Sequence, residues 1–289
     1  MPVHLVSIVI TLLIFVFVSA ALMAALSKYT QLLEIRGSIS KRVALILQVS
    51  GILFLVFLWQ TICWTGWVTP SLLPPPFKVL QAYPVLHFKF ALVRNLGYSC
   101  YLNGMGYLEA VAVCLPLGFV IGMLPLFEGM FSKQVDAIRY LPLTALTGLF
   151  MVWFGIDDMM KIQFLAVGIM VYLLPMVVMR VREVPVIYQQ TAFTLGASKW
   201  EMFATVFFPY VKSKVILDIK VLVAISWTYV TIAEMQHDVG GIGAMAVSTA
   251  KQGMVDKTFA ILTVILIVGF IQDKLFIGLD WLLNPQKYA

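Results

Sequence analysis

The sequence predicts an all-α, polytopic membrane protein, and three observations support this prediction. Of its 289 residues, 61% are hydrophobic and only 12% are charged, whereas soluble domains average roughly 45–50% apolar and 25% charged residues. The mean hydropathy is +0.96. Seven apolar stretches are long enough, or nearly so, to cross the hydrocarbon core, which takes about 20 residues of helix. This composition is therefore suited to a lipid bilayer.

The expected spans follow one another along the whole chain. They are residues 4–27, 43–63, 97–123, 138–155, 162–180, 215–235 and 258–283. The fourth is short, and the last becomes amphipathic after Gln272. The first lacks a positively charged start and exceeds the roughly 7–15 apolar residues of a signal peptide. We therefore expect it to be a retained helix.

Two domains are expected from this pattern. Residues 1–42 form an extra N-terminal transmembrane helix with a cytoplasmic linker, and residues 43–289 form the main transmembrane domain. The largest cytoplasmic loop of that domain covers about residues 181–214. With the N-terminus outside, twelve Lys and Arg residues of the loops lie inside and six outside. Because cytoplasmic loops are enriched in basic residues, we expect the C-terminus to be cytoplasmic.

Several chemistries are not supported by the sequence. Cys63, Cys100 and Cys114 lie in or beside apolar stretches without metal-ligand spacing, so we expect small buried hydrophobic residues. No basic run indicates nucleic acid. No Gly-x-x-x-x-Gly-Lys-Ser/Thr loop, His-Glu-x-x-His or Gly-x-Ser-x-Gly string occurs, so the chain is expected neither to hydrolyse ATP nor to be an enzyme. The run of residues 240–243, Gly-Gly-Ile-Gly, indicates a flexible turn.

The largest inner loop contains the most informative local pattern. Small, apolar and polar residues alternate around Gly196, which predicts two short helices bent at that glycine. Ala192 and Gly196 are four residues apart, so one helical face would let another surface approach closely. Ser198 is a candidate N-cap, with Glu201 completing a capping box. Pro209 is expected to break the second helix. The pattern predicts a compact helical projection that docks into a groove on a partner.

These residues resemble the coupling-loop motif of permeases of binding-protein-dependent ABC importers. That motif reads Glu-Ala-Ala, three residues, Gly, nine residues, Ile, one residue, Leu-Pro. The matching positions here, at the same spacing, are Gln190, Thr191, Ala192, Gly196, Val206, Phe208 and Pro209. Gln190 replaces the glutamate, so the ion pair with the ATPase that the motif implies is not expected here, although a glutamine can still form a hydrogen bond. The ATPase-coupling residues that the resemblance implies are Gln190, Thr191, Ala192, Gly196, Ala197, Ser198, Lys199 and Pro209.

Other matches, spread over about residues 58–284, resemble the nitrate, sulfonate, taurine and bicarbonate branch of these permeases. They are Ser71 to Pro76, Leu115 to Gly118, Trp153 to Ile156 followed by Lys161 and Ile162, Thr194 to Ser198, and Ala233 to Met235. The first span lies outside the pattern, and only anchoring or packing is expected of it.

The resemblance implies the type I ABC importer transmembrane fold, with a six-helix core plus one extra N-terminal helix, in a bacterial inner membrane. It implies separate ABC ATPase subunits that bind ATP and Mg, a solute-binding protein, and a second permease copy, of which an identical chain is the simplest case. The permease itself would bind no cofactor. The implied cargo is a small anion or a sulfonate-like solute.

Polar residues within spans are candidates for the translocation pathway because they are costly in lipid. They are Glu109, Thr228, Thr231 and Glu234. For both glutamates a structural role within the helix bundle is the alternative, and a carboxylate at Glu109 would repel an anionic cargo. Asp218 is expected to form a surface ion pair with Lys214 or Lys220.

An ion-coupled secondary transporter is the alternative function. It predicts broken helices around a mid-membrane site and an internal repeat. The sequence shows no convincing repeat, and such a transporter would not need the helical projection.

Overall fold

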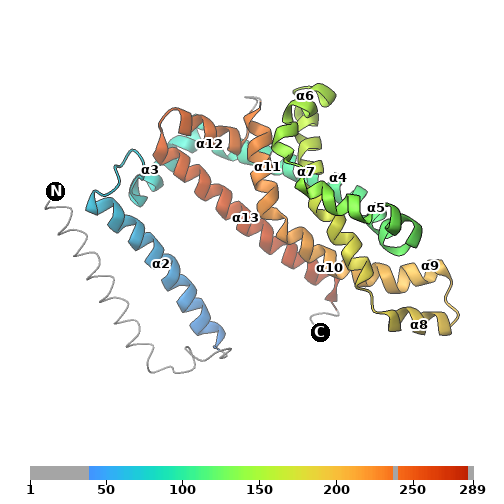
Figure 1. Ribbon diagram of the computed structural model, residues 1–289. Helices are drawn as coiled ribbons and strands as arrows, with labels where there is room; N and C mark the ends of the chain where they lie inside the picture. The colour runs from blue at the N-terminus through green and yellow to red at the C-terminus, as the bar shows by residue number, and fades with distance from the viewer. Residues whose placement is uncertain (1–38, 237–239, 286–289) are drawn as a thin grey trace. The chain divides into compact units, whose positions relative to one another are not determined.

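The structure, a computed structural model, describes residues 39–236 and 240–285. Within these ranges every regular element is helical (Figure 1). The elements are α2 (Lys41–Thr65), α3 (Pro76–Phe90), α4 (Leu92–Met123), α5 (Pro125–Ala137), η2 (Ile138–Tyr140), η3 (Leu143–Leu146), α6 (Thr147–Phe154), α7 (Asp158–Arg182), α8 (Val186–Thr194), α9 (Lys199–Met202), η4 (Phe203–Phe207), α10 (Phe208–Val221), α11 (Val223–Met235), α12 (Ile242–Lys251) and α13 (Val255–Leu283). The first expected span, residues 4–27, lies outside the described residues.

The described residues fall into two compact units. One contains the described residues up to Leu86 together with Thr249–Ala260, and the other contains His87–Ser248 and the residues from Ile261 onward. The functional candidates lie in the second unit. In the first unit, the apolar central part of α2 has no buried residue, as suits a helix that lipid surrounds.

Four to six described segments can span a membrane. Helices α2, α4, α7 and α13 are each long and apolar enough. Two bent pairs, Pro125–Tyr140 with Leu143–Phe154 and Lys199–Val221 with Val223–Met235, would each add one. The expected span at residues 138–155 is therefore not one straight helix. The axis turns by 86° between the two halves of its pair, at a break that contains Pro142, which has no N–H to continue a helix.

Helices α4 and α7 form the most extensive helix contact of the second unit, and glycines on α4 allow the close approach. A Cβ at Gly106 would lie 2.8 Å from Leu165 Cβ, and one at Gly122 would lie 2.7 Å from Val181 Cβ. A Cβ at Gly118 would overlap Val177. Small residues in one stripe let membrane helices pack backbone to backbone. This contact fixes α7, whose C-terminal end leads into the expected coupling segment.

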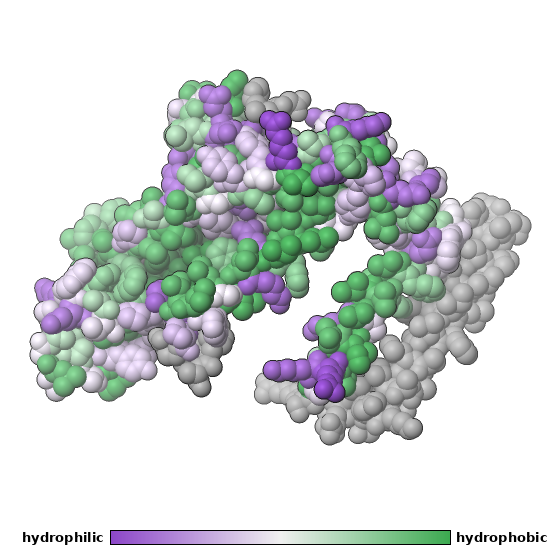
Figure 2. Space-filling model, turned by 180° about the vertical axis from the view of Figure 1, so that it is seen from behind, coloured by the Kyte–Doolittle hydropathy of each residue, from purple (hydrophilic) through white to green (hydrophobic). Residues whose placement is uncertain are grey.

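The second unit has an apolar core that extends to the base of that segment. Leu173, Val177, Val211 and Val215 of α7 and α10 are at most 2% exposed within it. Much of the face shown in Figure 2 is hydrophobic. Large exposed apolar side chains of the second unit include Leu266 and Phe270 of α13. A buried core with an apolar exterior is typical of a helix bundle in lipid.

Candidate functional site

The expected helical projection is present, and we call α8, α9 and the residues between them the knob. Gly196 follows the end of α8 with φ of 79°, a left-handed conformation that favours glycine. Its N–H donates to the Phe193 carbonyl (3.0 Å), and the Ala197 N–H donates to the Ala192 carbonyl (2.9 Å). These two bonds make a Schellman motif, which ends a helix by satisfying its last carbonyls. The predicted bend at Gly196 is confirmed.

Helix α9 begins with the predicted capping box. The Glu201 N–H donates to Ser198 Oγ (3.3 Å), and the Ser198 N–H donates to Glu201 Oε2 (2.7 Å). These bonds satisfy backbone donors that the first turn of a helix leaves free. Lys199, the first residue of α9, is exposed. The turn between the two knob helices is thus defined at both ends by local hydrogen bonds.

The knob exposes large apolar side chains at its tip. Leu195 is 82% exposed and Trp200 is 72% exposed. Ala192, in contrast, is partly buried against the apolar core of the second unit. Ala192 and Gly196 therefore do not share an outward helical face as expected, because α8 has already ended before Gly196. The exposed apolar tip is what remains for a partner to contact.

Pro209 does not break the helix, which corrects the expectation for that residue. The chain continues in one direction from Lys199 to Val221 through a π-helical turn at Phe203–Phe207, where the Phe208 N–H donates to the Phe203 carbonyl. In a regular α-helix the proline ring would clash with the carbonyl four residues earlier, that of Thr205. The wider turn accommodates the ring, so the helical run that starts in the knob continues into α10 without interruption.

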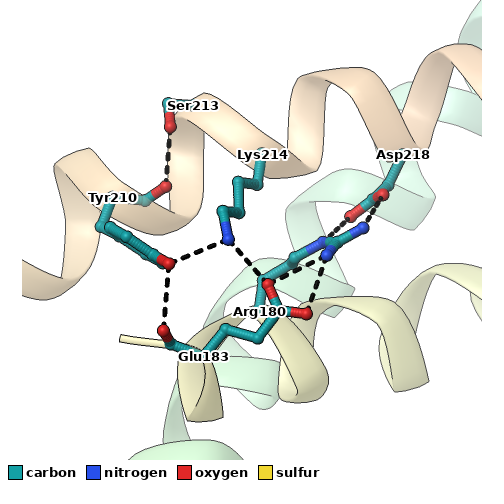
Figure 3. A network of polar contacts seen from close by, with 6 residues as sticks. All are labelled: Arg180, Glu183, Tyr210, Ser213, Lys214 and Asp218. Carbon is teal, nitrogen blue, oxygen red and sulfur yellow. Dashed lines mark hydrogen bonds and ion pairs between the residues drawn. The ribbon is translucent and has the colours of Figure 1, made fainter. Parts of the chain in front are cut away.

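A polar network lies at the base of the knob and joins α7 to α10 (Figure 3). We call it the inner network. The Arg180 guanidinium holds Asp218 with two bonds, Nε to Oδ2 (2.8 Å) and Nη2 to Oδ1 (2.7 Å). Asp218 is only 7% exposed. The expected surface ion pair with a neighbouring lysine is therefore wrong: Lys214 bonds to Glu183 (2.8 Å) and Lys220 pairs with Asp273 (3.3 Å).

Glu183 occupies the centre of the inner network. Its carboxylate accepts hydrogen bonds from Lys214 and from Arg180 (2.9 and 3.0 Å). Its main-chain carbonyl accepts one from the Tyr210 hydroxyl (3.0 Å). The hydrogen bond from Lys214, followed by that from Arg180, holds the pKa of Glu183 below its ordinary value. These bonds therefore favour the charged form of the carboxylate.

A second polar group, which we call the outer cluster, surrounds Glu234. The Glu234 side chain is fully buried and accepts hydrogen bonds from the Ser99 hydroxyl and from the Gly243 N–H (2.7 Å). Ser99 Oγ in turn accepts from the Ile242 N–H (2.8 Å). A Cβ at Gly241 would overlap the Glu234 carboxylate. The Gly-Gly-Ile-Gly run is therefore a close-packed strap over Glu234 and not the flexible turn that the sequence indicated.

Lys161 lies in the same part of the second unit. It is fully buried, and its Nζ donates to the Tyr98 hydroxyl (3.0 Å), which donates to Asp158. Within the described ranges no carboxylate lies within 4.0 Å of Lys161 Nζ. The sequence singled out Lys161 and Glu234 separately and missed Tyr98 and Ser99. A possible signal was the polar face that Asn95 and Ser99 form at the start of α4, and Asn95 Oδ1 accepts from the Gly241 N–H (2.9 Å).

The four candidate pathway residues are not gathered in one place by any hydrogen bond in the described structure. Glu109 is half-buried and accepts from the Gln163 amide (2.9 Å). Thr228 and Thr231 donate to carbonyls of their own helix (3.2 and 3.1 Å). Glu234 belongs to the outer cluster. A role of these residues in translocation stays a prediction.

Comparison with known proteins gives the family. The family model of the binding-protein-dependent transport system inner membrane component matches residues 114–276. The putative aliphatic sulfonates transport permease of Bacillus subtilis strain 168 is 25% identical over 76% of this chain and 80% of its own. The taurine transport system permease of Escherichia coli K12 is 24% identical over 89% and 94%. The nitrate import permease of Synechocystis is 22% identical over 82% and 88%.

Among solved structures, the fold is similar to that of the inward-facing MetNI methionine ABC transporter. The TM-score is 0.60 at 15% identity, covering 68% of this chain and 97% of that chain. With the family match extending over more than half of the sequence, this helical chain belongs to the inner membrane components of binding-protein-dependent transport systems, as the permease subunit of an ABC transporter and not as its ATPase.

Proposed function

We propose that this permease serves an importer of small sulfonate-like or related anions and that its knob docks on the ATPase. The knob is the observation that carries this proposal. It is closed at one helix end by the Schellman motif and at the next helix start by the capping box, and it exposes Leu195 and Trp200. A defined helical tip with exposed apolar side chains is suited to insertion into a groove.

The expected assembly contains two copies of this chain, two ATPase subunits that bind ATP and Mg, and a solute-binding protein outside the cell. The N-terminus lies outside, the C-terminus lies in the cytoplasm, and the extra N-terminal helix anchors the chain. Residues 1–42 and 43–289 are its two domains. Nucleotide-driven closure of the ATPases would displace the knob and move the spans between inward-open and outward-open states. The family match favours this mechanism over the ion-coupled alternative.

The proposed cargo class has two supports. The relatives named above are permeases for sulfonates, taurine and nitrate, at 22–25% identity. In addition, a cavity of about 380 Å³ between α5 and α7 is lined by Arg139 and Arg182 together with Tyr172 and Asp136. Guanidinium groups suit planar or tetrahedral oxyanions because their N–H donors match the spacing of the oxygens.

Co-purification with candidate ATPase subunits tests the docking role. Leu195→Glu places a charge on the exposed tip without altering the left-handed residue, so we expect the ATPase to be lost while the variant elutes as the native chain does. Leu72→Glu is the matched control, because Leu72 is 70% exposed between α2 and α3, on the expected outer side. Retention of the ATPase by Leu195→Glu would place the docking surface elsewhere. Uptake of a sulfonate, of taurine and of nitrate by the reconstituted complex then identifies the cargo.

A further inference from the structure

The inner network links the chain that enters the knob to the chain that leaves it. Glu183 directly follows α7, and its carboxylate is bonded both to Arg180 of α7 and to Lys214 of α10. Its carbonyl is bonded to Tyr210, also of α10. One residue at the start of the loop thus connects both helices through its side chain and its main chain. The two ends of the knob cannot separate without breaking these bonds.

A second connection lies deeper in the bundle. The paired bonds from Arg180 to Asp218 cross from α7 to α10 beyond the contacts of Glu183 (Figure 3). The planar guanidinium fixes the angle as well as the distance between the two groups. Because Asp218 is buried, sliding one helix along the other would leave a buried carboxylate unpaired, which is strongly unfavourable. The inner ends of α7 and α10 are therefore braced against each other.

The braced region ends at a structural weak point on each helix. In α7, Pro175 lies little more than a turn before Arg180 and removes a backbone hydrogen bond. In the other helix, Leu222 lies one turn after Asp218, where the axis bends by 49° between Val221 and Val223. The network thus lies between the knob and the two positions, Pro175 and Leu222, at which these helices can change direction most readily.

We propose that Arg180, Glu183 and Asp218 are positioning residues that make the knob and the inner ends of α7 and α10 one rigid body. Displacement of the knob then rotates these ends about Pro175 and Leu222 and reaches the translocation pathway. This inference rests on the proposed docking of the knob on the ATPase. Without the network, the same displacement would be taken up at the base of the knob. ATP would then be hydrolysed without movement of the spans.

The test compares the amount of cargo taken up with the amount of ATP hydrolysed, using the full complex in proteoliposomes with loaded binding protein. The main variant is Asp218→Asn, which keeps the shape of the side chain and leaves Arg180 paired with Glu183. Arg180→Lys keeps the charge but removes the fork, and the exchange Arg180→Asp with Asp218→Arg restores a pair in the opposite sense. Asp273→Asn is the matched control, because it makes the same change in the Lys220–Asp273 pair, which is about one-third exposed and lies outside the network.

We expect Asp218→Asn to lower cargo uptake per ATP at least about fivefold, the lower range of coupling between distant sites. ATP hydrolysis and ATPase co-purification stay near native, the exchange variant recovers the ratio in part, and Asp273→Asn retains the native ratio. The inference is overturned if uptake and ATP hydrolysis fall in parallel. It is also overturned if uptake per ATP stays native in every variant.

Two further results separate the inference from the proposed function. Loss of the ATPase from Asp218→Asn, with docking by the native chain intact, means that the network only folds the knob, and this also overturns the inference. Failure of the native chain to bind any ATPase refutes the proposed function itself. If Asp218→Asn does not fold, Glu183→Gln replaces it, since it keeps one acceptor oxygen for Lys214 or Arg180, and a smaller fall in uptake per ATP is expected.

Discussion

Glu234 is a carboxyl side chain that protein groups enclose completely, and Glu234 and its partners lie on three separate helices. Ser99 lies on α4, Glu234 itself on α11, and Gly243 at the start of α12. Acceptor oxygens close to the first N–H groups of a helix are favourable, because these groups have no partner within the helix. The arrangement assigns Glu234 to holding the strap of glycines in place in this conformation.

We predict that Glu234→Gln lowers the free energy of unfolding by about 1–3 kcal/mol, because an amide N–H₂ replaces one acceptor oxygen and leaves the buried Gly243 N–H without its partner. Glu109→Gln is the matched control, since Glu109 is half-buried and accepts one bond from Gln163. We expect it to cost less than about 1 kcal/mol. Thermal unfolding in detergent measures both, and equal losses would contradict the structural role of Glu234.

Single residues also show which contacts a sequence reveals. The capping box of Ser198 and Glu201 was predictable because its partners are three residues apart. The partner of Asp218 was not, because local reasoning offers Lys214 and Lys220, whereas helix packing brings Arg180 from 38 residues away. The bond from Ser99 to Glu234 joins residues 135 apart. No periodicity in the sequence indicates such a pairing.

At the scale of elements, Gly196 determines where α8 ends. We predict that Gly196→Ala destabilises the knob by about 1–2 kcal/mol, because a Cβ is disfavoured in the left-handed conformation. Gly196→Asn should cost less, since asparagine tolerates that conformation. Hydrogen exchange of the α8 and α9 amides measures the effect. Gly97→Ala is the control, because Gly97 is a helical glycine with open space around it. An equal loss of α8 and α9 protection in both variants would contradict the role of Gly196 in ending α8.

The helix pattern was predictable in its positions and less so in its directions. Apolar length located α2, α4, α7 and α13 because a span needs about 20 such residues. The 86° turn within the expected fourth span was missed because hydropathy does not record direction. The continuous run through Pro209 was missed because a single wider turn, at Phe203–Phe207, removes the clash that would otherwise end the helix.

At the scale of the whole molecule, the expected topology makes a direct prediction. Lys78 and Lys199 are both exposed but are expected on opposite sides of the membrane. We expect Lys78→Cys to react with a membrane-impermeant maleimide in spheroplasts and Lys199→Cys to react only after lysis. The three native cysteines, which are all free, are first replaced by alanine. Cys100 in particular is exposed and not buried as expected. The reverse labelling pattern would show that the topology is opposite to the expected one.

The π-helical turn at Phe203–Phe207 has a consequence for how such permeases diverge. Each residue of an α-helix advances the chain by roughly 100° about the helix axis, and the wide turn contains one residue more than a regular helix needs. Deleting one residue there, together with Pro209→Ala to remove the ring that the wide turn accommodates, would turn the knob by roughly that angle about α10 while leaving its composition and its caps unchanged. A change of chain length at this turn therefore alters the direction in which the knob points. Changes in the knob itself would instead alter its contacts with the proposed ATPase partner.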